Sequence, residues 1–348
     1  DLRTRLAVAV LLTLISATAR AARVSVWIPP WDANALTSVQ RNVDAITESN
    51  PVWYSWNTDG TIAKNWNAEN ATWRAAMTGT RLIPTVQNVV NKAFSASTAA
   101  TVLGTAASRE AHAASIAQLV ILNAFDGIDI DYERVPTTSR ADFTAFVDTL
   151  AQKLHATGKQ LSITVYPKTS DSQNWNGPGS QDWVTIGRLA DSVKIMAYDF
   201  HWSTSDAGAI TPIDWLHQVA TYAESVIPAA KIMMGLPWYG YDWVGTNGAT
   251  MSYAAAMQLS ATNGIAIQRD ANDEPTFKYA DHTVYFQDAT SFGRKIEMLK
   301  LQHGKIGGWA NWAAGQEDPA IWNMLRLQST PLQTGATPAP TMKNKRRI

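Results

Sequence analysis

The chain has 348 residues, of which 46% are hydrophobic and 17% charged, so it can bury a large core and is not disordered as a whole. Its 29 basic and 29 acidic residues balance, which argues against nucleic acid or an anionic membrane as the main partner. Cysteine is absent and the six histidines form no H-x-x-x-H pair, so disulfides and thiolate metal sites are excluded and no zinc motif is present.

The two ends of the chain differ in composition from the rest. Arg3 and Arg5 precede an apolar run that is followed by small residues typical of a cleavage site. This pattern predicts a signal peptide over residues 1–22 and a protein that is secreted or held in the cell envelope, extracellular or periplasmic. An N-terminal membrane anchor is the alternative. Residues 329–348 are rich in Pro and Thr and then basic, which predicts a disordered tail.

Between these ends, short runs of β-branched and aromatic residues alternate with longer stretches of helical periodicity. Helix 138–157 is typical, because apolar residues recur at helical spacing, Ser139 can cap its start and Gly158 can end it. Strands are predicted at 23–28, 51–56, 81–86, 125–133, 160–167, 192–200, 231–240 and 305–312. Helices are predicted at about 34–48, 70–78, 97–123, 138–157, 181–190, 213–226, 291–303 and 318–327.

Eight strand–helix units in succession predict an α/β fold of the (β/α)8 TIM-barrel type over residues 23–328. A doubly wound open sheet is the structural alternative, although no G-x-G-x-x-G follows the first strand. The stretch before the last strand is too long for one helix and contains "TFKYADHTVYFQD", which alternates as an antiparallel hairpin does. We therefore expect a small α+β insertion at about 242–290, between strands 7 and 8. We expect a monomer whose mature chain does not span a membrane.

The predicted fourth strand carries four carboxylates within "AFDGIDIDYERV". Because the side chains of a strand alternate between its faces, Asp129, Asp131 and Glu133 share one face, while isoleucines and a tyrosine occupy the other. In a barrel the apolar face packs on the helices, so the three carboxylates point inward and rise toward the C-terminal end, where barrel enzymes place catalytic groups. Asp126 has the opposite parity, and we expect it to have a structural role at the start of the strand.

Three inward carboxylates in a poorly hydrated interior cannot all remain ionised at low cost. Burial and like charges should raise at least one pKa, which creates the protonated acid that a general-acid step requires. Such an acid suits protonation of a glycosidic oxygen. A calcium loop does not fit, because alternating isoleucines are wrong for a solvated loop and the sixth position is not Gly. A D-x-D metal site, as in some metal-dependent sugar transferases, stays open. A structural acid cluster is disfavoured, since the strand contains no basic partner.

Four motifs together resemble those of the family 18 glycoside hydrolases, the chitinase-like (β/α)8 enzymes. The spacing D-x-x-D-x-D-x-E runs from Asp126 to Glu133, "MAYD" ends at Asp199, and "GLPWYG" and "GGWANW" follow in the expected order. The resemblance covers residues 23 to 327. It is most similar to the bacterial branch of spore-germination and cortex-lytic hydrolases, on the stretches "YPKTSD", "MAYDFHW", "TPIDWLHQVATYA" and "GLPWYGYDW".

The resemblance implies a retaining mechanism in which the 2-acetamido group of the substrate is the nucleophile. Glu133 would be the general acid and base, Asp131 would orient the acetamido group, and Asp129 would share a proton with Asp131. It further implies that no metal and no organic cofactor is needed. Tyr198 and Asp199 complete the implied catalytic set, and the implied substrate-binding residues are Trp312, Tyr239 and Trp309.

Trp312 matches the tryptophan that lies under the sugar in the family, and a small shift of strand register would exchange its role with that of Trp309. The implied substrate is an N-acetylglucosamine-containing glycan, with peptidoglycan fragments favoured and chitin oligosaccharides second. Strand 3 reads "LIPTVQN" and lacks the S-x-G-G pattern of true chitinases, which argues against crystalline chitin. A non-catalytic lectin on the same barrel is the rival function, and the presence of Glu133 favours the enzyme.

Overall fold

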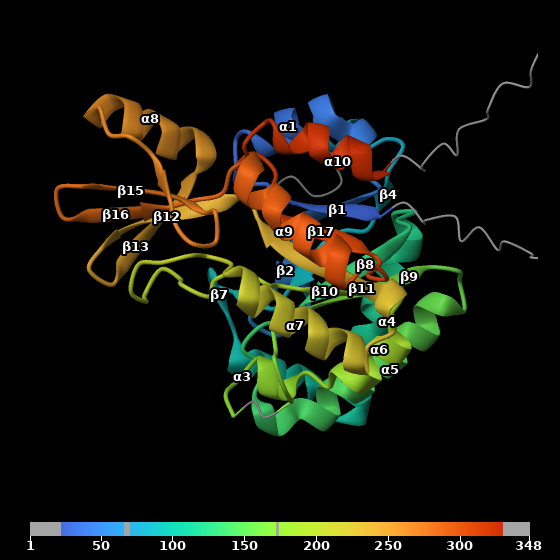
Figure 1. The fold of residues 1–348 in the computed structure, drawn as a ribbon. Coiled ribbons are helices and arrows are strands. Elements are labelled where there is room, and N and C mark those ends of the chain that lie inside the picture. Colours follow the sequence, from blue (N-terminus) through green and yellow to red (C-terminus); the bar gives the residue numbers. More distant parts are fainter. Residues whose placement is uncertain (1–21, 66–69, 172–173, 330–348) are drawn as a thin grey trace, which may run out of the picture.

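Eight parallel strands close into a barrel, as predicted (Figure 1). The computed structural model describes residues 22–65, 70–171 and 174–329, so all but the last residue of the predicted signal peptide and most of the predicted tail lie outside the described residues. The first strand pairs with both the second and the last, which completes the ring. The barrel strands are β1 (Arg23–Ile28), β2 (Glu48–Trp56), β5 (Thr85–Gln87), β8 (Gly127–Asp131), β9 (Gln160–Val165), β10 (Ser192–Ile195), β11 (Ile232–Pro237) and β17 (Gly308–Trp312).

Helices follow the barrel strands and cover their outer face (Figure 1). One prediction is wrong, because the helix expected over 97–123 is two helices that meet at Gly104 and Thr105. Thr105 and Ser108 form a reciprocal capping box, which starts the second helix. The helices are α1 (Ala35–Asn42), α2 (Ala71–Ala76), α3 (Ala96–Leu103), α4 (Ala106–Leu122), α5 (Arg140–His155), α6 (Trp183–Leu189), α7 (Ile213–Val226), α9 (Ala289–Gln302) and α10 (Ile321–Ser329).

Helix α5 ends as predicted but does not start as predicted. Ser139 occupies the N-cap position, but its side chain makes no capping hydrogen bond, because a short 3-10 turn (Thr137–Ser139) leads into the helix. Gly158 lies just beyond the helix with φ +68°, a conformation that suits glycine at a helix end.

The predicted insertion forms a five-stranded antiparallel sheet with one helix, and it projects from one side of the barrel (Figure 1). It follows β11 directly and so begins at residue 239, slightly earlier than expected. Phe277, Val284 and Phe286 pack with Ala256 of its helix in a separate small core. Its elements are β12 (Tyr239–Val244), β13 (Asn247–Ser252), α8 (Tyr253–Asn263), β14 (Gln268–Arg269), β15 (Pro275–Tyr279) and β16 (His282–Tyr285).

Short strands in the connections around β2 and β5 complete the list of described strands. β3 (Ile62–Lys64) pairs antiparallel with β2, β4 (Arg81–Leu82) pairs parallel with β2, and β6 (Val89–Val90) forms a hairpin with β7 (Ala93–Phe94).

Strand β8 divides its side chains between the two sides of the barrel wall, as the alternation predicts. Ile128, Ile130 and Tyr132 are fully buried in the core beneath the helices. Asp129 and Asp131 lie on the opposite, inner face. Asp126 is exposed, and its carboxylate accepts a hydrogen bond of 2.7 Å from the backbone N–H of Leu82.

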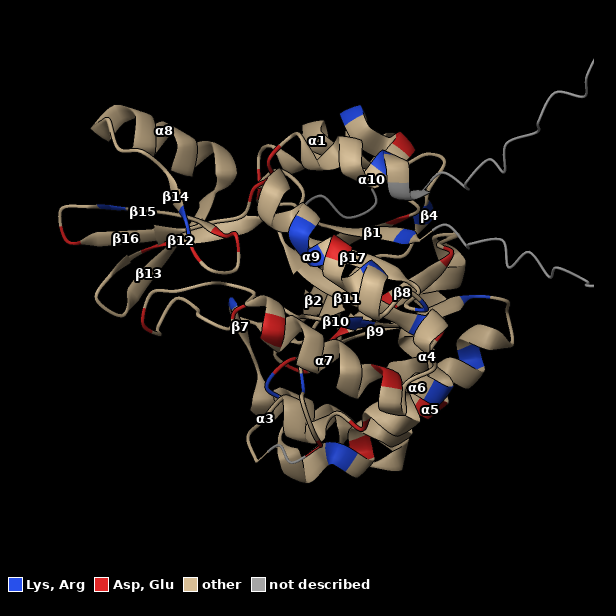
Figure 2. Ribbon diagram, viewed as in Figure 1, with Lys and Arg blue, Asp and Glu red and all other residues tan. Residues whose placement is uncertain are grey.

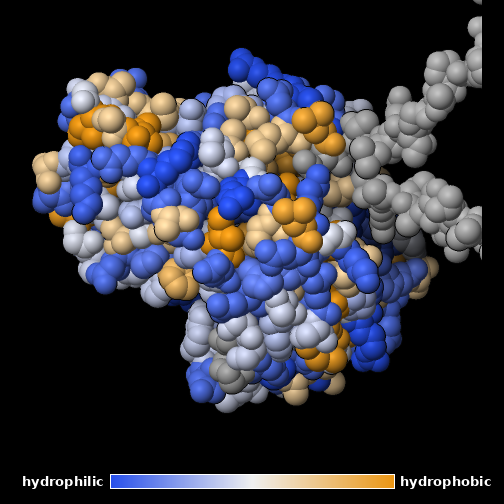
Figure 3. Space-filling model, in the orientation of Figure 1, coloured by the Kyte–Doolittle hydropathy of each residue, from blue (hydrophilic) through white to orange (hydrophobic). Residues whose placement is uncertain are grey.

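In the ribbon of Figure 2, acidic and basic residues are interspersed along the helices, and neither sign of charge dominates this view. In Figure 3 this face is largely hydrophilic, with apolar side chains grouped near α8 and in small patches over the barrel helices. Across the part of the chain that the structure describes, no helix is long and apolar enough to cross a membrane.

Asp126 offers a direct test of the structural role assigned to it. Asp126→Ala should lower the free energy of unfolding by about 1 kcal/mol, because the N–H of Leu82 loses its acceptor. Asp126→Asn keeps an acceptor oxygen and should stay close to the parent protein. Denaturant unfolding measures both, and equal stability of the two variants would contradict the role.

Candidate active site

Glu133 lies immediately beyond β8, at the C-terminal end of the barrel. Asn88 fixes its backbone from both sides, because the Asn88 Oδ1 accepts from the Glu133 N–H at 2.8 Å and the Asn88 Nδ2 donates to the Glu133 carbonyl at 2.8 Å. The Tyr166 hydroxyl donates to Glu133 Oε2 at 2.5 Å. The position of this carboxyl group is therefore set by residues from two neighbouring βα connections.

Glu133 has the titration behaviour that a general acid requires. Burial raises its pKa to about 7, and the negative charge of Asp199 acts in the same direction. The hydrogen bond from Tyr166 and the charge of Arg134 oppose this rise. Near neutral pH the group is therefore divided between the protonated and ionised forms, which suits an acid that must also act as a base.

Asp131 lies deeper in the barrel than Glu133, and one of its two carboxylate oxygens accepts a hydrogen bond. The register of β5 and β8 places Gln87 opposite Asp131, and Gln87 Nε2 donates to Asp131 Oδ2 at 2.8 Å. Asp131 Oδ1 is buried and has no hydrogen-bond partner among the described residues. Burial, followed by the charge of Glu133, raises the pKa of Asp131 well above its usual range. An unpaired buried acceptor beside the acid marks a position for a donor supplied by a ligand.

Asp129 is fully buried at the deepest position and is fully engaged. Trp27 Nε1 donates to Asp129 Oδ2 at 3.0 Å, and Thr85 Oγ1 donates to the same oxygen at 2.9 Å. Lys194 of β10 lies 3.3 Å from Asp129 Oδ1 and 2.8 Å from Glu48 Oε1. Although β8 itself contains no base, the barrel supplies one from another strand. The sharing of a proton between Asp129 and Asp131 stays a prediction.

Tyr198 and Asp199 follow β10 and face the same end of the barrel. Burial raises the pKa of the Tyr198 hydroxyl, and Asp131 is the neighbouring charge with the largest effect on it. This hydroxyl has no hydrogen-bond partner within the described part of the chain, so it is a free donor near Asp131. Asp199 adopts φ +59°, and its Oδ1 accepts from the hydroxyls of Tyr239 and Tyr241, the latter at 3.0 Å.

The two tryptophans of β17 face opposite sides of the barrel wall. Trp312 is partly exposed and contacts Trp27 edge to face, with ring centroids 5.9 Å apart. Trp309 is only 3% exposed and belongs to the core beneath the helices. It pairs in register with Val24, which lies in the same core. The structure therefore does not support the prediction that Trp309 binds substrate, whereas Trp312 lies on the side of the carboxylates.

Several residues of the site were not singled out from the sequence. Tyr166 closes "QLSITVY", and Gln87 and Asn88 close "TVQN", so each stands at the end of a predicted strand where a barrel places functional groups. Lys194 carried no such signal, since it lies in an apolar strand. Tyr239, predicted to bind substrate, is nearly buried and holds Asp199 through its hydroxyl.

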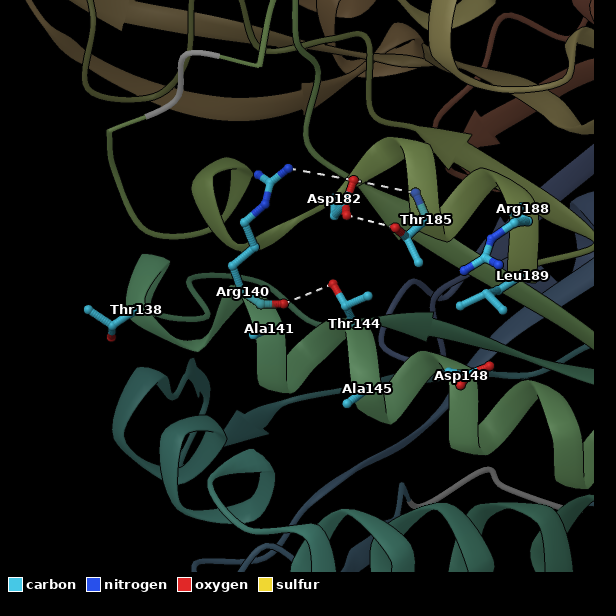
Figure 4. A pocket seen from close by; sticks show the side chains of 10 residues that line it. All are labelled: Thr138, Arg140, Ala141, Thr144, Ala145, Asp148, Asp182, Thr185, Arg188 and Leu189. Carbon is cyan, nitrogen blue, oxygen red and sulfur yellow. Dashed lines mark hydrogen bonds and ion pairs between the residues drawn. The ribbon is translucent and has the colours of Figure 1, made fainter.

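A surface groove of about 630 Å³ lies elsewhere, between α5 and α6 on the outside of the barrel (Figure 4). Arg140 on its rim pairs with Asp171 at 2.8 Å and with Asp182 at 3.6 Å. None of the predicted site residues lines this groove. Within the described ranges, no group of three or more His, Asp or Glu side chains is arranged to hold a metal ion.

Comparison with known proteins identifies the family. Residues 89–317 match the sequence family described as Glycosyl hydrolases family 18. The chain is 31% identical over 252 residues to the cortical fragment-lytic enzyme of Bacillus anthracis, a match that covers 69% of this chain and 58% of that protein. The chain therefore belongs to glycoside hydrolase family 18, as the four motifs predicted.

Solved structures agree with this identification. The spore cortex-lytic enzyme SleL of Bacillus cereus superposes with a TM-score of 0.81 and 28% identity, covering 90% of this chain and 75% of that one. A chitinase from Chromobacterium violaceum ATCC 12472 superposes with a TM-score of 0.81 and 26% identity, covering 88% and 99% of the two chains. The chain spans less than two thirds of the length of the curated relatives that it matches first.

Lys194 provides a test of the charge balance at the base of the site. Lys194→Met should lower the free energy of unfolding by about 3 kcal/mol, because it removes the ammonium that lies against both buried carboxylates, Glu48 and Asp129. Lys305→Met, which removes an exposed lysine, should change stability by less than about 0.5 kcal/mol. Denaturant unfolding measures both.

The double variant Lys194→Met/Glu48→Gln removes one charge of each sign. Its loss of unfolding free energy should be smaller than the sum of the losses of the two single variants. Each single substitution removes one charge and leaves its partner, whereas the double variant removes both. Simple additivity would contradict the coupling of the two groups.

Proposed function

We propose that the protein is a retaining glycosidase that cleaves β-1,4 linkages of N-acetylglucosamine-containing glycans with the assistance of the substrate's own acetamido group. The observation that carries the proposal is the buried and unpaired Asp131 Oδ1, which lies beside a glutamate with a pKa of about 7. Membership in glycoside hydrolase family 18 supports the same assignment of function.

In this mechanism Glu133 gives its proton to the glycosidic oxygen as the bond to the anomeric carbon breaks. The acetamido carbonyl oxygen of the same sugar attacks that carbon, and an oxazolinium ion forms. Glu133, now ionised, takes a proton from a water molecule that opens the ring and restores the β configuration. The proton returned to Glu133 balances the cycle, and no enzyme carboxylate bonds to the sugar.

Asp131 orients the acetamido group by accepting its N–H at the unpaired Oδ1. In the free protein, burial and the nearby charge of Glu133 favour the protonated form of Asp131. The positive charge of the oxazolinium ion favours the ionised form, so the interaction strengthens as the reaction proceeds. Tyr198 donates its free hydroxyl to the acetamido oxygen, and Asp199 contributes to binding and distorting the sugar. Trp312 provides the apolar surface beneath the sugar ring.

Peptidoglycan or its fragments is the substrate class that we favour, with chitin oligosaccharides second. The name of the B. anthracis relative supports the former and that of the C. violaceum chitinase supports the latter. Both polymers present a 2-acetamido group at the cleaved sugar. Offering the protein purified peptidoglycan and chitin oligosaccharides separately, and identifying the reducing ends released, distinguishes them.

Two other functions are less well supported. A lectin on the same barrel does not require a proton donor. Glu133 nevertheless has a pKa of about 7 and is positioned by Tyr166 and Asn88, as a general acid would be. A metal-dependent transferase would need a metal ion beside the carboxylates. The ammonium of Lys194 already lies against Asp129 and supplies the positive charge there.

We further propose that the protein acts outside the cytoplasm, because residues 1–22 have the composition of a leader.

Glu133→Gln tests the assignment of the acid. The amide cannot donate the proton, so kcat on a susceptible glycan should fall by roughly 10²- to 10⁴-fold while sugar binding is retained. Kinetics and equilibrium binding of the same oligosaccharide check the two parts. Turnover at the parental rate would refute the assignment, and loss of binding together with turnover would favour a structural role.

The pH dependence follows from the raised pKa of Glu133. The reaction needs the protonated form at the start, so kcat/KM should fall as pH rises through about 7. A pH–rate profile measures this limb. A limb centred near pH 4.5, the ordinary range of a glutamate, would show that burial does not shift this acid.

A further inference from the structure

An aromatic pair, Tyr166 and Trp175, lies beside the general acid. Tyr166 follows β9, the strand adjacent to β8, and its hydroxyl donates to Glu133. The ring of Trp175 contacts the ring of Tyr166, with centroids 5.3 Å apart and planes inclined at 72°. Trp175 is therefore linked to the reacting carboxyl group through a single side chain.

Trp175 is unusual because it is 55% exposed, whereas most of the tryptophans that the structure describes are buried. Its contact with Tyr166 is edge to face, so this contact leaves at least one face of the indole free. A flat apolar ring with an open face matches the C–H face of a sugar.

The loop that carries Trp175 is tied to the site by several hydrogen bonds. The N–H of Gly177 donates to the carbonyl of Val135 at 2.9 Å, just beyond Glu133. Farther along the loop, Gln181 Oε1 accepts from the N–H of Tyr166 at 2.9 Å. These bonds hold the loop close to the acid before any ligand binds, and the contact with the Tyr166 ring orients the indole, which together reduce the ordering cost of binding.

Gly177 lets the loop lie directly on the Tyr166 ring. It adopts φ +96°, and a Cβ at this position would lie 2.5 Å from Tyr166 Cε2. Any larger residue would therefore displace the tyrosine that contacts Glu133. The glycine, the tyrosine and the tryptophan form one packed unit around the acid.

The position of this unit indicates which sugar it would contact. In the proposed mechanism, Asp131, Tyr198 and Trp312 hold the sugar that supplies the acetamido group. Trp175 makes no ring contact with these groups within the described residues and reaches the site only through Tyr166, a partner of Glu133. A sugar on the far side of the protonated oxygen is the leaving group.

We propose that Trp175 is a binding platform for the leaving-group sugar, and that Tyr166 is a positioning residue that couples this platform to Glu133. The inference rests on the proposed function. It implies that efficient cleavage requires a sugar on the leaving-group side of the cleaved bond.

The test compares two substrates that differ in the leaving group. The first is the N-acetylglucosamine tetrasaccharide, whose cleavage releases a sugar. The second is the preformed oxazoline of the disaccharide, which has no leaving group and needs Glu133 only as the base that activates water. Trp175→Ala should lower kcat/KM for the tetrasaccharide roughly tenfold and leave oxazoline hydrolysis unchanged. Val184→Ala, at an exposed position on α6, is the control and should change neither rate.

Tyr166→Phe tests the positioning role through a different readout. The hydroxyl stabilises the ionised form of Glu133, so its loss should move the basic limb of the pH profile upward by about half a unit to one unit. Both substrates should be slowed, because Glu133 acts in both steps. A packing role alone would leave the position of this limb unchanged.

The outcomes distinguish failure of the proposed function from failure of the binding platform. If the parent protein hydrolyses neither of these two substrates and also leaves purified peptidoglycan intact, the proposed function fails. If the parent is active but Trp175→Ala affects both substrates equally or neither at all, the platform is refuted. An unchanged pH profile for Tyr166→Phe refutes the coupling through Tyr166.

Discussion

The desolvation of the carboxylates on β8 is the constraint on which the site depends. A strand in a barrel wall must direct alternate residues inward, so Asp129, Asp131 and Glu133 lose water together while Ile128 and Ile130 pack against the helices. Burial disfavours ionised carboxyl groups, and each group therefore needs a partner or a proton. The partners in this barrel come from neighbouring strands, which makes the closed sheet itself part of the chemistry.

The number of hydrogen-bond and charge partners around each buried carboxylate decreases from the interior toward the C-terminal end of the barrel. Asp129 has a tryptophan, threonines and the ammonium of Lys194 around it. Among the described residues, Asp131 has one donor, Gln87, and one unpaired oxygen. In the same part of the chain, Glu133 has a single hydrogen bond to its carboxyl group, from the Tyr166 hydroxyl, and its pKa is about 7. This gradient supports the proposal that the outermost carboxyl group, Glu133, carries out the proton transfer.

The sequence predicted those parts of the molecule that depend on local periodicity. The alternation along β8, the eight units and the insertion could all be read from residue spacing. Lys194 and Tyr166 could not be placed, because their contacts with β8 depend on which strands are neighbours and on their register. Trp309 and Trp312 share one short strand, and its pairing with β1 and β11 decides which of them faces inward. The break at Thr105 was missed because apolar residues continue on both sides of it.

In the proposed mechanism, the acetamido oxygen of the substrate is the nucleophile, with Asp131 as the partner of the acetamido group. The most direct measurement is the hydrolysis rate for a series of substrates whose acetyl group at the cleaved sugar carries zero to three fluorine atoms. Fluorine withdraws electrons from the carbonyl oxygen, so kcat/KM should fall steeply with each substitution. A rate that is independent of fluorination would contradict the account and indicate direct attack by water or by an enzyme group.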